Sequence, residues 1–467
     1  MKSLVMAFVL LFSGAALAVD TEAREYTAAR EAYRQWYPTV SMEGIMNGMR
    51  QLGVRDNVNM FSAQADSKTL GFTANQDTPY GAAVVDLTKG PFVVDMPAGP
   101  FMGLVNAHDQ SWIIDMGIPG QDAGKGGKYL IVPEGYKGQI PQGYYVGKSD
   151  TNKVFVVARI IPQGNDLNKA QKQLAGIKIY PLSAAKNPKP LSIIDISGRD
   201  GDLSSLKWEG NIQFWEKLAK VINEEPVNKK KQAAYDQLKA LGIEKGKAFK
   251  PNASLRSTLD RAAQDSQKEL LASSYATTGR PDKVKWSDRK WEWLLLSSKP
   301  EWAADHDSDA VARDRYFAQA IVMSPAMLRR DSTAGSLYWG AFKDSNNNAL
   351  DGGKSYKLTV PLPVPSRLFW SVTLYDSDTR SLIANGTKKS SLRSLVELAD
   401  LKGAKSVDLF FGPQAPAGKE AHWVKTSPGK TWFAYFRIYG PEKAAFDNTW
   451  KPGDFVQIQS ESMALNQ

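Results

Sequence analysis

One arginine and two aspartates are of residue types that could form a catalytic or anion-binding site. Asp77 lies in the polar stretch Asn75–Tyr80, Asp109 follows an apolar run, and Arg159 lies within the strand-like segment Val154–Ile161. Strand alternation places Arg159 on an apolar face, where a guanidinium group needs a partner. We therefore expect either a buried ion pair of Arg159 with Asp77 or Asp109, or an arginine that binds a substrate carboxylate, phosphate or sulfate beside an acid/base aspartate. The residue types do not choose between these two alternatives.

His108 is the best candidate for a general base among the three histidines His108, His306 and His422. It precedes Asp109, and its side chain is expected to point the opposite way along the strand. A surface histidine with satisfied hydrogen bonds is the alternative. Zinc would require all three histidines from separate regions, so the sequence predicts no metal site, and it identifies no cofactor. The predicted catalytic residues are Asp77, Asp109, Arg159 and His108.

Aromatic and polar side chains alternate in two further strand-like segments, Leu368–Tyr375 and Thr431–Tyr439. In each segment one face is apolar, and the other carries aromatic side chains together with Ser, Thr or Arg. Such a face suits a sugar or an aromatic ligand through stacking and a few directed polar groups, and it equally suits an interface with another domain. The predicted ligand-binding residues are Asn75, Tyr80, Trp370, Tyr375, Arg437 and Tyr439.

Several classes of enzyme are excluded by what the sequence lacks. It has no cysteine, which rules out thiol nucleophiles, cysteine-ligated zinc and disulfides. It has no P-loop, no Gly-x-Ser-x-Gly elbow and no His-Glu-x-x-His motif, so nucleotide-driven chemistry, the common serine-hydrolase fold and zincin proteases are not expected.

The formal net charge of +10 fits attraction to an acidic ligand or an anionic envelope surface, and it fits solubility alone. The run Asn228–Lys231 is interpreted as a solvated helix entry, so no nucleic-acid partner is expected.

The elements that must position these residues fall into helical and β-rich stretches. Residues 21–53 have helical spacing and predict two short helices separated at Pro38. Short strands punctuated by Gly and Pro begin near residue 80, disappear between about 206 and 327, and then return. We predict an α+β fold of two antiparallel β-sandwich or jelly-roll-like domains, with a mainly helical segment between them and short N-terminal helices. The predicted domains cover residues 19–200, 201–330 and 331–467.

The N-terminal residues have the composition of a secretory signal. A basic start at Lys2 is followed by the apolar run Leu4–Phe12, which is too short to span a membrane, and by the small-x-small end Ala16–Ala18. This predicts a signal peptide over residues 1–18 that is cut after Ala18. An uncleaved anchor is the alternative. We expect a periplasmic or secreted protein with no transmembrane span.

Two groups of motifs carry a resemblance to a known family. The N-terminal group is Asn75–Tyr80, Asp86-Leu87, Gly90-Pro91, Arg159 and Tyr180-Pro181-Leu182. The C-terminal group is Phe369–Asp376, Gly412-Pro413, His422-Trp423, Arg437–Pro441 and Trp450. Over about residues 25–185 and 335–455 the sequence resembles bacterial proteins that join domain of unknown function 1254 to domain of unknown function 1214, sometimes labelled cell-envelope proteins. The stretch Asn75–Tyr80 departs from the more usual Asn-Thr-Asp-Thr-Leu-Tyr. The resemblance implies two β-domains with a helical part between them, and it implies no reaction.

Two functions fit these observations. The first is an exported hydrolase or lyase that acts on a small polar or glycosidic substrate in a cleft between the domains. In that enzyme Arg159 or Arg437 would hold the anion, Asp77 or Asp109 would be the acid/base, and aromatic side chains would form the walls. The second is a non-catalytic envelope protein that binds a small-molecule or saccharide ligand, or in which the same residues hold the domains together. The sequence does not select an oligomeric state.

Overall fold

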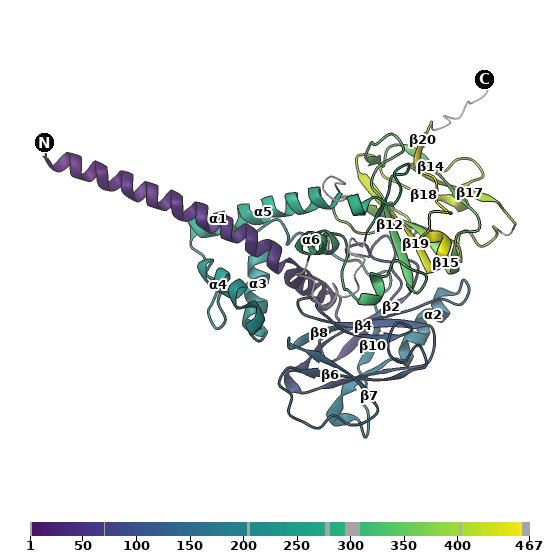
Figure 1. Cartoon of the computed structure of the whole chain (residues 1–467), viewed down its shortest axis with the longest axis horizontal. Coiled ribbons are helices and arrows are strands. Elements are labelled where there is room, and N and C mark those ends of the chain that lie inside the picture. Colours follow the sequence, from purple (N-terminus) through teal and green to yellow (C-terminus); the bar gives the residue numbers. More distant parts are fainter. Residues whose placement is uncertain are drawn as a thin grey trace.

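The computed structural model describes residues 2–69, 71–202, 206–275, 281–294, 309–401 and 403–459, and for residues 2–20 it describes the backbone alone. The chain forms a β-domain, a helical unit and a second β-domain (Figure 1). The prediction of an α+β fold, with mostly antiparallel sheets and a helical segment between two β-rich domains, is confirmed. None of the described helices is both long enough and apolar enough to cross a membrane.

The first β-domain is built from a six-stranded sheet and a four-stranded sheet that share one core. The larger sheet has the order β10-β1-β2-β8-β4-β5, with β10 (Ser192–Asp195), β1 (Asn59–Ala63), β2 (Tyr80–Asp86), β8 (Lys153–Ile160), β4 (Phe101–Ala107) and β5 (Trp112–Gly117). The smaller has the order β7-β6-β3-β9, with β7 (Tyr144–Ser149), β6 (Gly127–Pro133), β3 (Phe92–Met96) and β9 (Lys178–Pro181). A short helix, α2 (Leu167–Gln173), follows β8. The β1–β10 and β6–β7 pairs are parallel, which corrects the prediction of purely antiparallel sheets for these two pairs.

Strand alternation along β8 decides what each face of the larger sheet meets. Val154 and Val156 point into the core between the sheets. Phe155 and Val157 point the other way, toward the methionine-rich end of helix α1. Arg159 shares this second face, as the sequence predicted, and it lies near the end of the strand where the second β-domain covers the sheet.

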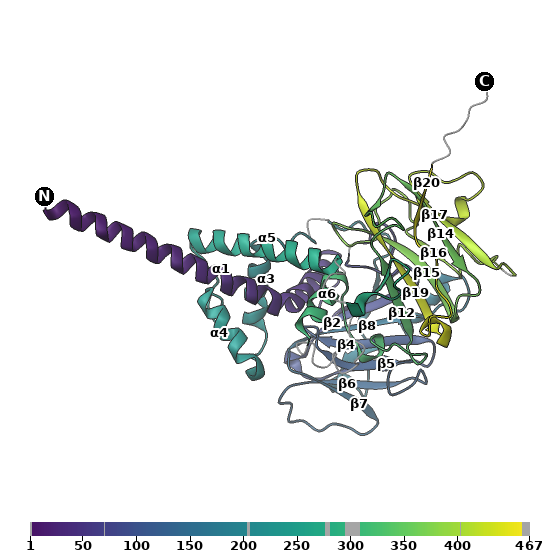
Figure 2. The same cartoon turned by 45° about the horizontal axis from the view of Figure 1, so that its top comes forward.

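The helical unit contains α1 (Lys2–Gln51), α3 (Gln213–Glu224), α4 (Gln232–Ala240), α5 (Ala253–Tyr275) and α6 (Ala310–Gln319). Helix α1 packs against the other four, and α5 runs alongside it (Figure 2). The prediction of two short N-terminal helices is wrong, because α1 continues through Pro38. Proline has no N–H to donate to the carbonyl of Arg34 four residues earlier. The guanidinium of Arg313 donates to that carbonyl instead at 3.3 Å, which satisfies the oxygen that the proline leaves free.

The second β-domain also contains two sheets around one core. One sheet has the order β11-β12-β19-β15-β16, formed by β11 (Trp291–Trp293), β12 (Ser336–Ala341), β19 (Thr431–Pro441), β15 (Ser366–Asp376) and β16 (Ser391–Arg393), with β13 (Leu350–Asp351) paired to β19. The other has the order β18-β17-β14-β20, formed by β18 (Trp423–Lys425), β17 (Ser406–Gly412), β14 (Ser355–Pro361) and β20 (Val456–Ile458). Strand β11 corrects the expectation that no strand occurs between residues 206 and 327. The β17–β18 pair is parallel.

Candidate functional site

The two β-domains meet across the loop that precedes β2, which we call the crossing loop (residues 73–79). Its backbone and side chains bond to strands and turns of the second β-domain. Tyr375 donates its hydroxyl to the Ala74 carbonyl at 2.9 Å. The Gln76 amide donates to the Lys388 carbonyl at 2.6 Å and accepts from the Ser390 N–H at 3.0 Å. The polar stretch singled out in the sequence is therefore an inter-domain connection.

Asp77 lies at the centre of this connection and is buried, with 2% of its surface exposed. It accepts hydrogen bonds from the hydroxyls of Ser371 at 2.5 Å, Tyr439 at 2.9 Å and Ser391 at 3.3 Å. Its backbone N–H donates to the side chain of Asn75 at 2.7 Å. The predicted ion pair with Arg159 does not form, because the loop turns Asp77 toward the second β-domain. Its partners are neutral hydroxyls.

Arg159 makes no ion pair with any described residue. Its guanidinium donates to the Ser336 hydroxyl at 3.2 Å and to the Tyr80 hydroxyl at 3.5 Å. It also lies over the ring of Tyr439, with Cζ 5.3 Å from the centroid. Asp109, the other predicted partner, lies against the helical unit. Arg159 is therefore a half-buried cation surrounded by hydroxyl groups and aromatic rings.

Arg437 lies on the neighbouring strand β19 and is more deeply buried, with 3% of its surface exposed. One end of its guanidinium donates to the Tyr375 hydroxyl at 2.5 Å and to the Thr73 carbonyl at 3.4 Å. Its Nε and Nη1 atoms have no hydrogen-bond partner among the described residues. Leaving such a donor buried and unpaired costs about 1–3 kcal/mol. Two N–H groups of a buried cation therefore lack an acceptor.

Tyr338, which the sequence analysis did not identify, links the two arginines. Ser336 donates its hydroxyl to the Tyr338 hydroxyl at 2.7 Å and accepts a hydrogen bond from Arg159. The Tyr338 ring centroid lies 5.7 Å from Cζ of Arg437. Burial alone would raise the pKa of Tyr338, but the two guanidinium groups and the hydrogen bond to Ser336 lower it. A usable signal was present, since Ser336, Tyr338 and Gly340 alternate with apolar residues along β12. We call Arg159, Arg437, Tyr338, Tyr375 and Tyr439 the arginine–tyrosine cluster.

Asn75 and Tyr80, two of the predicted ligand-binding residues, adjoin this cluster. The side-chain amide of Asn75 donates to the Tyr439 hydroxyl at 2.7 Å and to the Tyr80 hydroxyl at 3.3 Å. Trp370 does not adjoin it. It stacks on Phe436 with the ring centroids 5.5 Å apart, inside the core of the second β-domain. Its selection as a cleft wall is wrong because alternation along β15 turns it to the opposite face from Tyr375.

A small pocket, with room for about one water molecule and partly open to solvent, reaches the cluster from the surface. Ser336 and Tyr338 lie on its wall, and so do Trp293 and Arg330. Arg330 lies over the Trp293 ring, with Cζ 4.6 Å from the centroid. The pocket is lined by Trp293, Met327, Leu328, Arg329, Arg330, Ser336, Leu337 and Tyr338. The wall therefore combines a flat aromatic side chain, cationic groups and hydroxyls.

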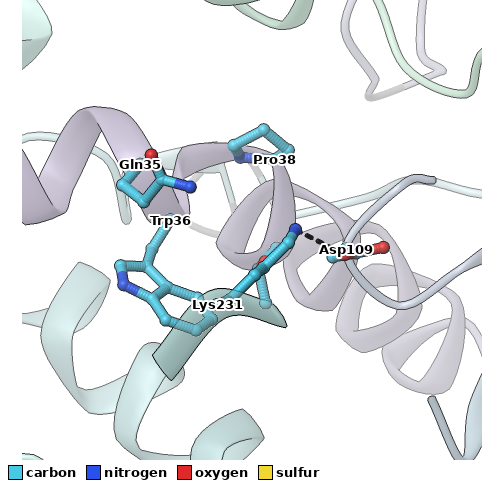
Figure 3. A pocket seen from close by; sticks show the side chains of 6 residues that line it. Gln35, Trp36, Pro38, Asp109 and Lys231 are labelled. Carbon is cyan, nitrogen blue, oxygen red and sulfur yellow. Dashed lines mark hydrogen bonds and ion pairs between the residues drawn. The ribbon is translucent and has the colours of Figure 1, made fainter. Parts of the chain in front are cut away.

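Asp109 lies in a different place, beside a second small pocket that is lined by α1 and by Lys231, which precedes α4 (Figure 3). It forms an ion pair with Lys231 at 2.9 Å and accepts a hydrogen bond from the Ser111 hydroxyl at 2.6 Å. Figure 3 shows Trp36 and Pro38 of α1 beside this pair. Asp109 and Asp77 contact different parts of the molecule, so the structure does not bring the two predicted acid/base residues together.

His108 is completely buried, which corrects the alternative of a surface histidine. Nδ1 lies 2.7 Å from a carboxylate oxygen of Glu225, and Nε2 lies 3.3 Å from one of Glu43. Burial alone would lower the pKa of His108, but these two carboxylates outweigh it and raise the pKa. His108 therefore joins α1, the end of α3 and the first β-domain through two carboxylates. This arrangement does not suit a general base, which must be free to accept a proton.

Among the described residues, no three His, Asp or Glu side chains group closely enough to hold a metal ion. His306 lies outside the described residues. His422 lies in a 3-10 turn of the second β-domain.

Comparisons with known proteins identify two regions of the chain. Residues 56–181 match the family described as "Protein of unknown function (DUF1254)", and residues 335–443 match "Protein of unknown function (DUF1214)". No curated protein matches the chain. The crystal structure of the VPA0106 protein from Vibrio parahaemolyticus covers 93% of this chain over its whole length, with a TM-score of 0.56 and 16% identity. An uncharacterized protein from Burkholderia cenocepacia covers 97% of the chain over 98% of its own length, with a TM-score of 0.42 and 12% identity. The likeness to the Vibrio protein is one of overall fold.

Proposed function

The chain belongs to the proteins that carry a DUF1254 region followed by a DUF1214 region, and we propose that it binds a small organic anion between its two β-domains. The binding groups are the guanidinium groups of Arg159 and Arg437 in the arginine–tyrosine cluster. The observation that carries this proposal is the pair of buried Arg437 atoms, Nε and Nη1, that have no acceptor among the described residues. A carboxylate, phosphate or sulfate would supply the acceptor and the charge.

The charge balance around the cluster supports the same conclusion. Burying a cation without a counter-ion is costly, and proteins usually pair it with a carboxylate. Asp77 is a carboxylate whose charge acts on Arg437, and one carboxylate can balance only one of the two guanidinium groups. The site therefore retains an excess of positive charge that a ligand anion can neutralise. Tyrosine hydroxyls and the Trp293 ring beside the pocket offer contacts to the rest of the ligand.

The positions of the residues first selected as acids and bases support anion binding better than they support hydrolysis. Glycoside hydrolysis uses two carboxyl groups that face each other across the bond to be cut. Asp77 faces the second β-domain, whereas Asp109 faces the helical unit. A purely structural role for Asp77 and the crossing loop is compatible with anion binding, because Asp77 makes its contacts without using the unpaired atoms of Arg437.

Binding can be tested by titrating the protein with glucuronate, citrate, phosphate and sulfate in a calorimeter. We expect at least one of them to bind the wild type, and we expect Arg437→Met to weaken that binding at least tenfold. Arg256→Met is the matched control, because it removes an exposed arginine of α5 that pairs with Glu216. The proposal fails if none of the four anions binds, or if Arg437→Met binds as tightly as Arg256→Met.

We propose further that the protein is exported to the periplasm or envelope after cleavage of residues 1–18. The signal-like composition of these residues supports this location. Cleavage would leave residues 19–51 of α1 in place, including the part that packs on the other helices. N-terminal sequencing of the protein from a periplasmic fraction should begin at Val19. A sequence that begins at Met1 or Lys2 would contradict cleavage.

A further inference from the structure

Lys283 and Glu292 form a buried lysine–glutamate pair in the second β-domain. Nζ of Lys283 lies 2.7 Å from Oε2 of Glu292, and the two residues are 1% and 7% exposed. Glu292 belongs to β11, and its backbone forms an antiparallel bridge with Val284, the residue that follows Lys283. This backbone pairing keeps the amine beside the carboxyl group.

An aromatic ring and a backbone carbonyl lie on the other sides of the amine. Nζ of Lys283 lies 5.1 Å from the centroid of the Phe342 ring and donates to the Ser274 carbonyl at 2.6 Å. Phe342 belongs to a cluster of buried apolar side chains, so the pair lies against a surface that excludes water. Oε2 of Glu292 accepts no aligned hydrogen bond from a described residue. The amine and the carboxyl group are therefore in contact at a site that solvates their charged forms poorly.

A second lysine–glutamate pair shows how unusual this environment is. Lys220 contacts Glu43 in the helical unit, and the Lys220 side chain is 44% exposed. Burial alone would raise the pKa of Glu43, but His108 and Lys220 lower it from 4.5 to about 2. For the other pair burial prevails, because it lowers the pKa of the Lys283 ammonium and raises that of the Glu292 carboxyl group, and their attraction reverses neither shift. The exposed pair is thus held as ions, whereas burial favours an uncharged amine and a carboxylic acid in the second β-domain.

We propose that Lys283 and Glu292 join in an isopeptide bond, a covalent cross-link within the chain. Nζ of the uncharged amine attacks Cδ of the Glu292 carboxylic acid, and a C–N bond forms. One C–O bond of the carboxyl group then breaks, and its oxygen leaves as water, with the acid proton and one proton from the amine. The product is an amide, nothing is oxidised or reduced, and no co-reactant is consumed. The cations of Arg315 and Lys343, whose charges act on Glu292, stabilise the negative charge that develops on the carboxyl oxygen.

The cross-link would secure an exposed edge of the second β-domain. Strand β11 has three residues and lies at the end of its sheet, where a strand opens easily and can pair with another chain. The sequence has no cysteine, so no disulfide can hold this strand. A bond between Glu292 and the 3-10 turn Pro281–Lys283 does so instead.

The mass of the intact protein tests this proposal. After the folded wild type has been kept at pH 8 for several days, its mass should be lower by one water molecule than the mass calculated from its sequenced N-terminus onward. A tryptic digest should contain a branched peptide that includes both Lys283 and Glu292. Lys283→Met should have the full calculated mass. Lys220→Met is the matched control and should still lose one water molecule, because the exposed pair with Glu43 stays ionic.

Two results would overturn the cross-link. The first is a wild-type protein of full mass that yields no branched peptide. The second is a loss of water that persists in Lys283→Met, which would assign the missing water to other residues. Neither result depends on anion binding, because Lys283 and Glu292 are not members of the arginine–tyrosine cluster.

Discussion

Buried charges occur in two regions of this molecule, and the regions differ in whether a buried charge has an oppositely charged partner. Beside the helical unit, Arg380 of the second β-domain forms an ion pair with Glu209, and His108 lies between Glu43 and Glu225. In the arginine–tyrosine cluster, Arg437 and Arg159 meet hydroxyl groups, carbonyls and rings, and they form no ion pair with a described residue. Paired charges hold elements together, because each partner compensates the other. Unpaired cations are what a site for an anion requires.

The largest effect on stability should come from removing one partner of a buried ion pair. Glu209→Gln leaves Arg380, which is 1% exposed, without its counter-ion. We expect the free energy of unfolding to fall by about 3–5 kcal/mol, which urea denaturation can measure. Glu216→Gln is the control, because Glu216 forms an exposed pair with Arg256, and it should cost less than about 1 kcal/mol. Equal losses in the two variants would show that Arg380 does not depend on Glu209.

His108 provides a compensated charge whose contribution depends on pH. Because folding raises its pKa, the protonated histidine stabilises the fold at pH below its unfolded value of about 6.5, and this stabilisation is lost as the pH rises through the higher folded value. His108→Gln should therefore cost about 2 kcal/mol at pH 6 and less at pH 9. Urea denaturation at the two pH values measures the difference. A cost that is the same at both pH values would contradict a charged His108.

Asp115 is an uncompensated acid and provides the opposite case. It is 8% exposed and bonds to Ser324 and Trp112, and burial raises its pKa from 3.8 to about 6. A raised acid pKa favours the fold at low pH, and this contribution is lost as the pH rises from about 4 to about 6. Asp115→Asn should therefore be more stable than the wild type by about 1–2 kcal/mol at pH 8, and at pH 4 it should be no more stable. Thermal unfolding at the two pH values tests this, and a variant that is less stable at pH 8 would contradict it.

The smallest effect on stability should come from the cluster. Arg437→Met replaces an uncompensated cation by an apolar side chain of similar length, so the loss of its bonds to Tyr375 and Thr73 is offset by the removal of a buried charge. We expect the free energy of unfolding to change by less than about 1 kcal/mol in either direction. Arg380→Met is the matched variant, and it should cost about 3–5 kcal/mol because it strands Glu209. A large loss in Arg437→Met would make Arg437 a structural residue.

Sequence patterns predicted the parts of the site that depend on alternation along one strand. The faces of Leu368–Tyr375 and Thr431–Tyr439 are as expected, with Tyr375 and Arg437 turned to the first β-domain. The same alternation places Trp370 on the apolar face, with the core. Its selection as a ligand contact disregarded this alternation, which the structure follows. Tyr338 was missed because the short strand β12 was not identified.

The pairings between distant residues could not be predicted in this way. Asp77 finds its hydroxyl partners Ser371, Ser391 and Tyr439 at 294, 314 and 362 positions along the chain. The carboxylate of Glu225 reaches His108 across 117 positions. Such contacts depend on how the domains pack, and packing leaves no periodic trace in the sequence. A charged residue on an apolar face is recognisable from the sequence, but whether a carboxylate or a ligand meets it is decided by the fold.

Anion binding at the arginine–tyrosine cluster requires that the unpaired atoms of Arg437 receive an anion. A crystal structure of the wild-type protein grown with glucuronate tests this most directly. We predict the glucuronate carboxylate within hydrogen-bonding distance of Nε or Nη1 of Arg437, or of the Arg159 guanidinium beside it. A structure in which both Arg437 atoms donate to a protein carboxylate, with glucuronate absent from the cluster, would contradict anion binding at Arg437.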